Sequence, residues 1–523
     1  MNRYPRPTAI SRRAFTSSVL AGSVLLASPY LRRARAQEAR QGGTLIASLI
    51  DTLPSLHPMA RTTGNGWLVI ANLYNTLTML TPEGKVEPEL AESWEANDRL
   101  DVWTFKLRPG VKFHNGTPLT ASDVKATLDT LMQPHITARQ YVAPIANVGA
   151  LDDLTVRITL EAPTAELARQ LAFASTKIIS HKALENFDLL DSQPAGTGPF
   201  RMVSFTPNQE LVMERNPDYF RGPVPLDRLI VRILPDATTQ LAALRNREID
   251  VICEVTGDVY SRGVALPGTS GMLAGGGTIY PIRVTRAQPP FDDIRVRRAL
   301  AMALDRAGMV EALTHGTGTI GDDQPISDIY EFFSPGSGPI THDLDAARQL
   351  MQEAGYGGGA SAKFVIASSG VDRRSQSELM QAMASQIGLE LEVEMVDSLV
   401  FDQKYWGKPG VNSVGWYGAR ASIDAMLTLL LHTTEGTNDV QWGTPETDRM
   451  IESARATLDP QVRGKIYADL QQKLRDELPY IIPAFYRKMG LHNDYVQEVP
   501  FNGNQWDMRF EKSWMTEDAP QRM

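Results

Sequence analysis

Alternation of apolar and polar side chains predicts several strands in this chain. In the segment DVWTFKL, Trp103, Phe105 and Leu107 fall on one face, and Thr104 and Lys106 fall on the other. A period of two residues is typical of a half-buried strand. Further strands are expected at 44–49, 155–160, 228–234 and 389–396.

Capping residues predict where helices begin. Thr120 and Asp123 fit a capping box that opens a helix reaching about Met132. Four other helices are expected after aspartates, because a carboxylate can accept the free N–H groups of a first turn. These aspartates are Asp292 or Asp293, Asp305, Asp343 and Asp459, which is followed by Pro460.

Strands and helices are mixed along the chain, without internal repeats, and this indicates a multi-lobed α/β protein. Its 523 residues allow about three domains. The glycine-rich stretches at 275–277 and 355–361 are expected to be short loops.

Residues 1–36 differ from the rest of the chain. They contain seven Arg, among them the pair Arg12–Arg13, but no Lys, Asp or Glu. A modestly apolar stretch follows the pair and leads to Ala34-Arg35-Ala36. This layout is typical of a twin-arginine export signal cleaved before Gln37. A basic arm or a membrane anchor is the alternative, but 19–31 is too short to span ~30 Å of hydrocarbon.

The charge of the remaining chain argues against two classes of partner. Without residues 1–36 it has 45 basic and 61 acidic residues, a net charge of −16. Such a balance opposes unspecific binding to nucleic acid or to anionic lipid. The single cysteine, Cys253, rules out an intrachain disulfide, and no later stretch offers 18 consecutive apolar residues for a transmembrane helix. We therefore expect an exported periplasmic protein without an integral membrane segment.

Motifs for catalysis are weak. Ser122 and Lys125 fit S-x-x-K, but the partner motifs of that enzyme class are missing and the capping box explains the serine. The glycines at 275–277 lack the Lys-Ser/Thr of a phosphate-binding loop. The eight histidines show no zinc spacing. No enzyme activity, metal or cofactor is therefore expected.

Three segments together resemble one family. They are PELAESWEANDRLDVWTFKLRPGVKFHNGTPLTASDV (88–124), PAGTGPFRMVSFTPNQELVMERNPDYFRG (194–222) and QPPFDDIRVRRALAMALDR (288–306). They resemble the family-5 extracellular solute-binding proteins, which include the dipeptide- and oligopeptide-binding components of ABC importers. The resemblance runs from about Gly42 to Tyr486.

The resemblance implies a type II periplasmic-binding-protein fold, with two lobes, a hinge and an extra domain inserted in the N-terminal lobe. Lobe one would comprise 37–80, 193–284 and 488–523. The inserted domain would be 81–192, and lobe two 285–487.

The resemblance also implies a mechanism. A peptide or peptide-like small molecule would bind between the lobes, which close by a hinge motion. The closed protein, expected to be a monomer, would dock on an inner-membrane ABC permease driven by a cytoplasmic ATPase.

The segment VGWYGARASIDAML carries the strongest indication of ligand chemistry. Peptide-binding members of the family have an aspartate shortly after Gly-Trp, which binds the ammonium group of the peptide. Here Ala419 occupies that position, and Arg420 follows it. Arginine suits a carboxylate, because its planar fork donates two parallel hydrogen bonds. An anionic ligand is therefore expected, unless Arg420 pairs internally with Asp424 or lies on the surface.

Other ligand contacts are expected from the same resemblance. In lobe two they are Trp416, Tyr417, Asn438 and Trp442; in lobe one they are Asp51, Thr52 and Leu53. Two alternatives to import stay open: an exported hydrolase with dispersed catalytic residues, and a ligand sensor or chaperone on the same scaffold.

Overall fold

The computed structural model describes residues 42–522, except 51, 60–63, 83, 137–138, 140–141, 143–144, 369–370, 421, 435–436 and 502–506. The expected export signal and its cleavage point before Gln37 lie outside the described residues. So does Asp51, one of the expected ligand contacts.

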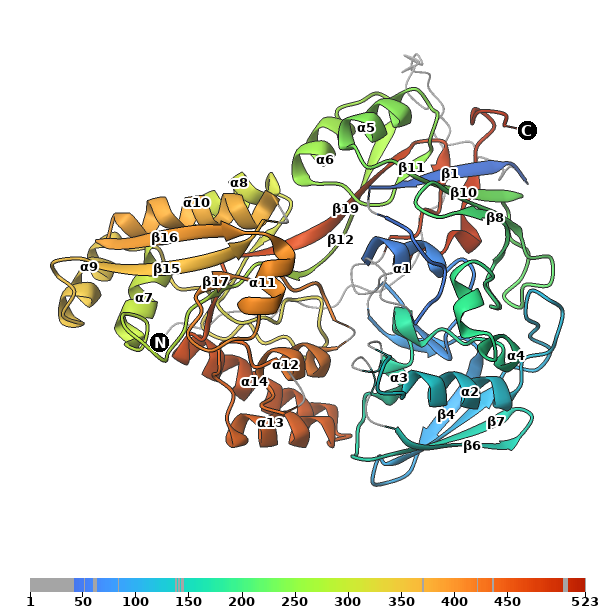
Figure 1. The fold of residues 1–523 in the computed structure, drawn as a ribbon, viewed down its shortest axis with the longest axis horizontal. Helices are drawn as coiled ribbons and strands as arrows, with labels where there is room; N and C mark the ends of the chain where they lie inside the picture. Colours follow the sequence, from blue (N-terminus) through green and yellow to red (C-terminus); the bar gives the residue numbers. More distant parts are fainter. Residues whose placement is uncertain are drawn as a thin grey trace, which may run out of the picture. The chain divides into compact units, whose positions relative to one another are not determined.

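The largest sheet collects strands from distant parts of the chain, in the order β12-β19-β11-β1-β10-β9-β8, with β14 also paired to β19 (Figure 1). Its strands are β1 (Thr44–Leu49), β8 (Phe200–Thr206), β9 (Glu210–Arg215), β10 (Arg228–Ile233), β11 (Val251–Ile252), β12 (Thr269–Ile279), β14 (Thr319–Ile320) and β19 (Ala484–Asn493). β1 pairs in parallel with both β10 and β11, and all six of its residues are buried. Burial on both faces explains its nearly continuous apolar run.

The smaller sheets are more local. One is antiparallel, in the order β4-β5-β7-β6, and comprises β4 (Ala91–Ala96), β5 (Val102–Leu107), β6 (Ile145–Asp152) and β7 (Thr155–Leu160). A three-stranded sheet comprises β13 (Ile282–Arg283), β17 (Ser413–Val414) and β18 (Tyr480–Ile481). The remaining pairs are β2 (Thr78–Leu80) with β3 (Val86–Pro88), β15 (Ala360–Ala367) with β16 (Leu389–Val396), and β20 (Val496–Gln497) with β21 (Trp514–Met515).

Helices flank these sheets. In the first half they are α1 (Gly64–Ile70), α2 (Ala121–Leu131), α3 (Leu167–Gln170), α4 (His181–Leu184), α5 (Ala237–Arg245) and α6 (Gly257–Val264). In the second half they are α7 (Ile294–Ala303), α8 (Arg306–Thr314), α9 (Leu344–Glu353), α10 (Val371–Ser385), α11 (Ser398–Lys404), α12 (Ile423–Leu431), α13 (Pro445–Arg455) and α14 (Pro460–Glu477).

Local sequence signals predicted these elements well. The strands expected at 44–49, 155–160 and 389–396 are β1, β7 and β16. The capping box of Thr120 and Asp123 opens α2. Four helices begin after the expected aspartates, whose carboxylates accept backbone N–H groups: α7 after Asp293, α8 after Asp305, α9 after Asp343 and α14 after Asp459.

The loop expected at 275–277 was wrong, because these glycines lie within β12. The register of β12 on β19 shifts between Ala274 and Thr278, so the stretch is an irregularity of a strand rather than a loop. A Cβ atom on Gly277 would lie 2.4 Å from Ile329 Cδ1 and 2.8 Å from Ala419 Cβ. Glycine is therefore required for close packing at this strand.

Two chain passes join the large sheet to the three-stranded sheet (Figure 1). One leads from β12 into β13, and the other from β18 into β19. β12 and β19 are antiparallel partners, and β13 and β18 pair with each other in the next sheet. The two passes therefore run side by side, as a hinge between two bodies requires.

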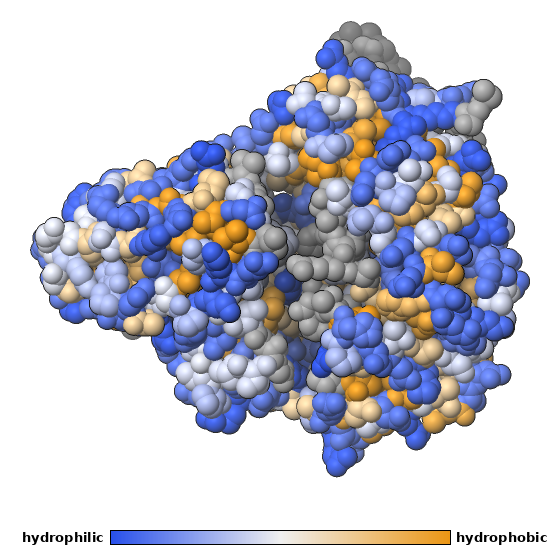
Figure 2. All heavy atoms as spheres, in the orientation of Figure 1, coloured by the Kyte–Doolittle hydropathy of each residue, from blue (hydrophilic) through white to orange (hydrophobic). Residues whose placement is uncertain are grey.

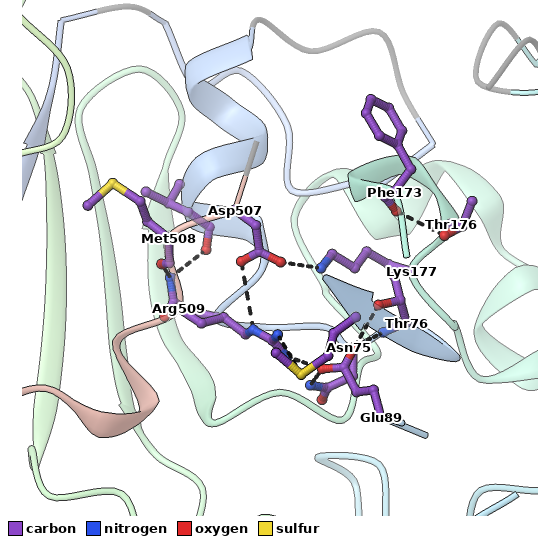
Figure 3. A network of polar contacts seen from close by, with 12 residues as sticks. Asn75, Thr76, Glu89, Phe173, Thr176, Lys177, Asp507, Met508 and Arg509 are labelled. Atoms are coloured by element: carbon purple, nitrogen blue, oxygen red, sulfur yellow. Dashed lines mark hydrogen bonds and ion pairs between the residues drawn. The ribbon is translucent and has the colours of Figure 1, made fainter. Parts of the chain in front are cut away.

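Buried ion pairs attach the C-terminal segment to the first half of the chain (Figure 3). Arg509 pairs with Glu89, which also accepts a hydrogen bond from Asn75. Asp507 lies with one oxygen 3.1 Å from Lys177 Nζ and the other 3.7 Å from Arg509 Nε. Burial raises the pKa of Asp507, and Lys177 opposes that rise.

Figure 2 shows hydrophilic side chains over much of the visible face, with hydrophobic ones in separate patches. Among the described residues, no helix is long and apolar enough to cross a membrane.

A buried histidine should make the stability of the fold sensitive to acid. The ring of His57 lies tilted against that of Phe187, with 4.1 Å between ring centroids, and its Nδ1 accepts the backbone N–H of Met59 at 3.1 Å. Burial lowers the pKa of His57 from 6.5 to about 4, although Asp191 and Asp188 act in the opposite direction. As the pH falls below 6.5, the unfolded chain takes up a proton that the folded chain does not. The free energy of unfolding should therefore decrease between pH 6.5 and 4, by at most about 3 kcal/mol.

Urea unfolding at pH 7, 6, 5 and 4.5 measures this loss. His57→Asn, which retains an acceptor but does not titrate, should reduce it, whereas His135→Asn at an exposed histidine serves as the matched control. An identical pH dependence in wild type and His57→Asn would contradict the prediction.

Candidate functional site

The strip 413–420 lies alongside the chain pass that leads from the large sheet into the three-stranded sheet. Ser413 and Val414 pair with β13, and Gly415 donates its N–H to the carbonyl of Pro281 at 2.9 Å. Tyr417 and Ile279 exchange two backbone hydrogen bonds of 2.9 and 3.0 Å. The strip thus extends the pairing of β13 back to the end of β12.

The buried carboxylate of Asp439 holds the strip in place. Asp439 has no exposed side-chain surface, and its Oδ2 lies 3.1 Å from Nε of Arg283, which is also fully buried. Asp439 also accepts hydrogen bonds from the hydroxyls of Tyr417 and Tyr480. The guanidinium of Arg283 lies over the ring of Trp406, 5.2 Å from its centroid. We call these five residues the Asp439 cluster.

The Asp439 cluster keeps its charges through mutual attraction. Burial is the largest single effect on Arg283 and disfavours its charged form, but Asp439 together with Tyr417 and Tyr480 outweighs it, so that the pKa of Arg283 is raised. Burial and the adjacent Asp439 both raise the pKa of Tyr417 well above its usual value, and the same causes act on Tyr480. Both tyrosines are therefore neutral donors, and the cluster is one carboxylate, one guanidinium and two hydroxyls.

Arg420 lies at the end of the strip and is half-buried. Its backbone N–H donates to the hydroxyl of Tyr330 at 2.9 Å, and its Nη1 donates to the carbonyl of Gly418 at 3.0 Å. Its Nε is buried and has no hydrogen-bond partner among the described residues. No carboxylate of the described residues forms an ion pair with Arg420.

A cavity of about 370 Å³ lies beside this end of the strip. One wall comes from the segment 329–332 and from Ser422 and Ile423. The opposite wall comes from the β2–β3 hairpin and from α3 with the residue before it. The lining residues are Gly84, Lys85, Val86, Glu166, Arg169, Ile329, Tyr330, Glu331, Phe332, Ser422 and Ile423. Burial raises the pKa of Tyr330 to about 12.

The expected aromatic contacts differ in exposure. Trp416 is 38 % exposed, whereas Tyr417 and Trp442 are each 2 % exposed. Tyr417 belongs to the Asp439 cluster, and Trp442 donates its Nε1–H to Glu477 at 2.7 Å. Their roles as ligand contacts stay predictions, and of these three rings only that of Trp416 offers substantial surface.

The other expected contacts are also placed. Asn438 is half-buried, and its side-chain oxygen accepts the backbone N–H of Gly443 at 2.9 Å. Thr52 is exposed and Leu53 is buried. None of these residues lines the cavity described above, and their contact with a ligand stays a prediction.

Asp424 has a different partner from the one considered above. It is buried, and its Oδ1 accepts a hydrogen bond from Arg455 Nε at 3.1 Å. Asp424 is therefore held by α13, and the internal partner considered for Arg420 is engaged elsewhere. Ala419, next to Arg420, is 4 % exposed and packs against Gly277. At the position of the expected ammonium-binding acid, the chain thus has an alanine that is buried and closely packed.

Sequence reasoning missed Arg283, Asp439 and Tyr480. One signal was available: Arg283 interrupts the apolar run from Tyr280 to Val284, where a charge needs a buried partner. Its partner Asp439 could not be identified from a single sequence. The described residues also contain no group of His, Cys, Asp or Glu that could hold a metal ion.

Comparisons with known proteins agree on one family. Residues 85–438 match the sequence profile of the bacterial extracellular solute-binding proteins, family 5. Heme-binding protein A of Haemophilus influenzae is 28% identical over 428 residues, 76% of this chain and 78% of that protein. The glutathione-binding protein GsiB of Pectobacterium atrosepticum is 26% identical over 459 residues, 85% of this chain and 88% of that protein. The structure of HbpA2 from Haemophilus parasuis superposes with a TM-score of 0.81 at 25% identity, covering 90% of this chain and all of that one.

Neutralising Asp439 should strongly destabilise the fold. Asp439→Asn leaves the buried guanidinium of Arg283 without its counter-charge, which typically costs roughly 3–5 kcal/mol of unfolding free energy. Asp345→Asn is the matched control, because Asp345 is 96% exposed and pairs with Arg348 on the surface. That variant should change stability by less than about 1 kcal/mol. Urea unfolding measures both, and equal stabilities of the two variants would contradict the structural role of the Asp439 cluster.

Proposed function

The chain belongs to the family-5 bacterial extracellular solute-binding proteins, and we propose that it captures an anionic, peptide-like small molecule for an ABC importer. The fold is that of the type II periplasmic binding proteins, with two lobes joined by a hinge. The function of the family is to bind a solute outside the cytoplasm and deliver it to a membrane permease, and it is not enzymatic.

The arrangement of the sheets supports a division into three parts. Within 37–80 and 193–284, the strands β1 and β8 to β12 lie in the large sheet, whereas β4 to β7 within 81–192 form a sheet of their own. The strands of 285–487 lie mainly in the sheets of β15–β16 and of β13, β17 and β18. These ranges correspond to lobe one, an inserted domain and lobe two, with 488–523 returning to lobe one.

The choice of an anionic ligand rests on Arg420. Arg420 is half-buried, its guanidinium has no carboxylate partner among the described residues, and its buried Nε–H has no acceptor there. A buried donor without an acceptor costs about 1–3 kcal/mol, and a ligand carboxylate would remove that cost. Arg420 is connected to the cavity through Tyr330, a lining residue whose hydroxyl accepts the backbone N–H of Arg420, although Arg420 itself does not line the cavity. The glutathione-binding relative is consistent with this choice, since glutathione is a peptide with two carboxylates.

The remaining partners follow from the proposed function. The chain acts as a monomer, and its closed form docks on a permease with a cytoplasmic ATPase. Export uses residues 1–36 as a twin-arginine signal, with cleavage before Gln37.

Removal of the Arg420 charge should weaken ligand binding. Arg420→Gln should lower the affinity for an acidic peptide such as glutathione by about tenfold or more, equal to ~1.4 kcal/mol. Arg420→Lys, a point charge without the planar fork, should lie in between. Arg374→Gln is the control, because Arg374 is 66% exposed and pairs with Glu378 along α10. Calorimetric titration with acidic peptides and with their amidated forms measures the effect; equal binding of both forms to wild type and to Arg420→Gln would reject the anionic ligand.

Ligand should also compact the protein. Hinge closure reduces the radius of gyration, which small-angle X-ray scattering measures with and without saturating ligand. An unchanged radius with a ligand that calorimetry shows to be bound would contradict closure.

A further inference from the structure

The inserted domain and lobe two are connected by polar contacts, in addition to the two chain passes. The side chain of Glu166, just before α3, accepts a hydrogen bond from Arg463 Nη1 of α14 at 2.8 Å. The backbone N–H of Ala165 donates to the carbonyl of Arg455 at 2.8 Å. Arg169 Nη2 lies 3.0 Å from Glu331 Oε2. We call these contacts the Glu166 latch.

The Glu166 latch is enclosed by protein. The side chains of Glu166, Arg463 and Arg169 are 5%, 11% and 14% exposed. Arg169 Nε lies 3.2 Å from the second oxygen of Glu166, so that two guanidinium groups flank one carboxylate. The guanidinium of Arg463 also lies over the ring of Phe332, 4.6 Å from its centroid. Such enclosure distinguishes the latch from the exposed ion pairs elsewhere on the surface.

Within the inserted domain, the latch residues are held in place. Arg169 Nη1 donates to the carbonyl of Gly84 at 2.6 Å, which connects α3 to the β2–β3 hairpin. Glu166 is therefore positioned by its own domain through Arg169 and presented to Arg463. On the other side, Arg455 is fixed by Asp424 at 3.1 Å within lobe two.

The latch also borders the cavity beside Arg420. Glu166 and Arg169 form part of one wall, and Glu331 and Phe332 form part of the other. Separation of the two walls would break the contacts of Glu166 with Arg463 and of Arg169 with Glu331. The contacts of the latch therefore form only when the two walls of the cavity are close together.

We infer that Glu166 is the positioning residue of a closing latch that sets how often the ligand-free protein is closed. The inference rests on the proposed hinge motion and adds the residues that oppose opening. A protein that is closed for part of the time binds with an apparent affinity scaled by its binding-competent fraction. Loss of the Arg463 contact should therefore open the free protein and change ligand affinity, although Arg463 itself does not line the cavity.

The test measures the distance between the two bodies without ligand. Glu92 in the inserted domain and Glu390 in lobe two are exposed and can be replaced by labelled cysteines, while Cys253 is buried. In this labelled background, Arg463→Met should shift single-molecule energy transfer toward the open state, reducing the closed fraction by about tenfold. Arg463→Lys, which retains the charge, should shift it less. Arg262→Met is the matched control, because Arg262 is 48% exposed and pairs within α6.

Two outcomes would overturn the latch. One is an unchanged closed fraction in Arg463→Met, shown to be folded by urea unfolding. The other is an equal shift in Arg262→Met. The result is separate from the proposed ligand, because it needs no ligand. If the wild type still compacts with ligand while Arg463→Met behaves as wild type without it, the latch fails and the proposed function stands.

Discussion

The ion pair between Arg283 and Asp439 is the constraint on which the three-stranded sheet and the strip 413–420 depend. Arg283 lies on the chain pass from the large sheet, and Asp439 lies in the loop after α12. Taking both charges out of water is costly, so their position is tolerated only where attraction and hydrogen bonds compensate. The hydroxyls of Tyr417 and Tyr480 supply those bonds. A shift of the strip 413–420 relative to the chain pass would break these hydrogen bonds. The bonds therefore fix the position of Arg420 at the end of the strip.

Local signals in the sequence were sufficient for the individual elements and insufficient for their contacts. The alternation in β5 and the capping box of α2 depend on residues within one element, and the structure contains both. The strand β12 was missed because glycines have no side chain to alternate, and its conformation depends on Ile329 and Ala419 from elsewhere. The fold itself followed from a resemblance over long segments rather than from any of these patterns.

The candidate site shows the same limit at the level of single side chains. Sequence placed Trp416, Tyr417 and Arg420 together, and the structure keeps them on one strip. Neighbouring residues of an extended strip point to opposite sides, so Tyr417 turns toward Asp439 while Trp416 is exposed. The sequence alone could not show which of these two sides is buried. Nor could it connect Asp424 with Arg455, because that pair depends on the packing of α12 against α13.

Two kinds of enclosed charge therefore have different tasks. Arg283 lies in β13, on the chain pass between the two bodies, and its pair with Asp439 is fully buried. Glu166 and Arg463 retain 5% and 11% exposure and connect parts that a hinge would move. A large apolar interface between the same parts would resist opening, because its apolar surface would be exposed to water. Ions that separate on opening regain their hydration instead, which offsets part of the cost of breaking the pair. Ion pairs thus give a closed state with a defined register but a small net free energy. That property suits a binding protein which must open again to release its ligand, because a ligand can decide a nearly balanced equilibrium with modest differential affinity.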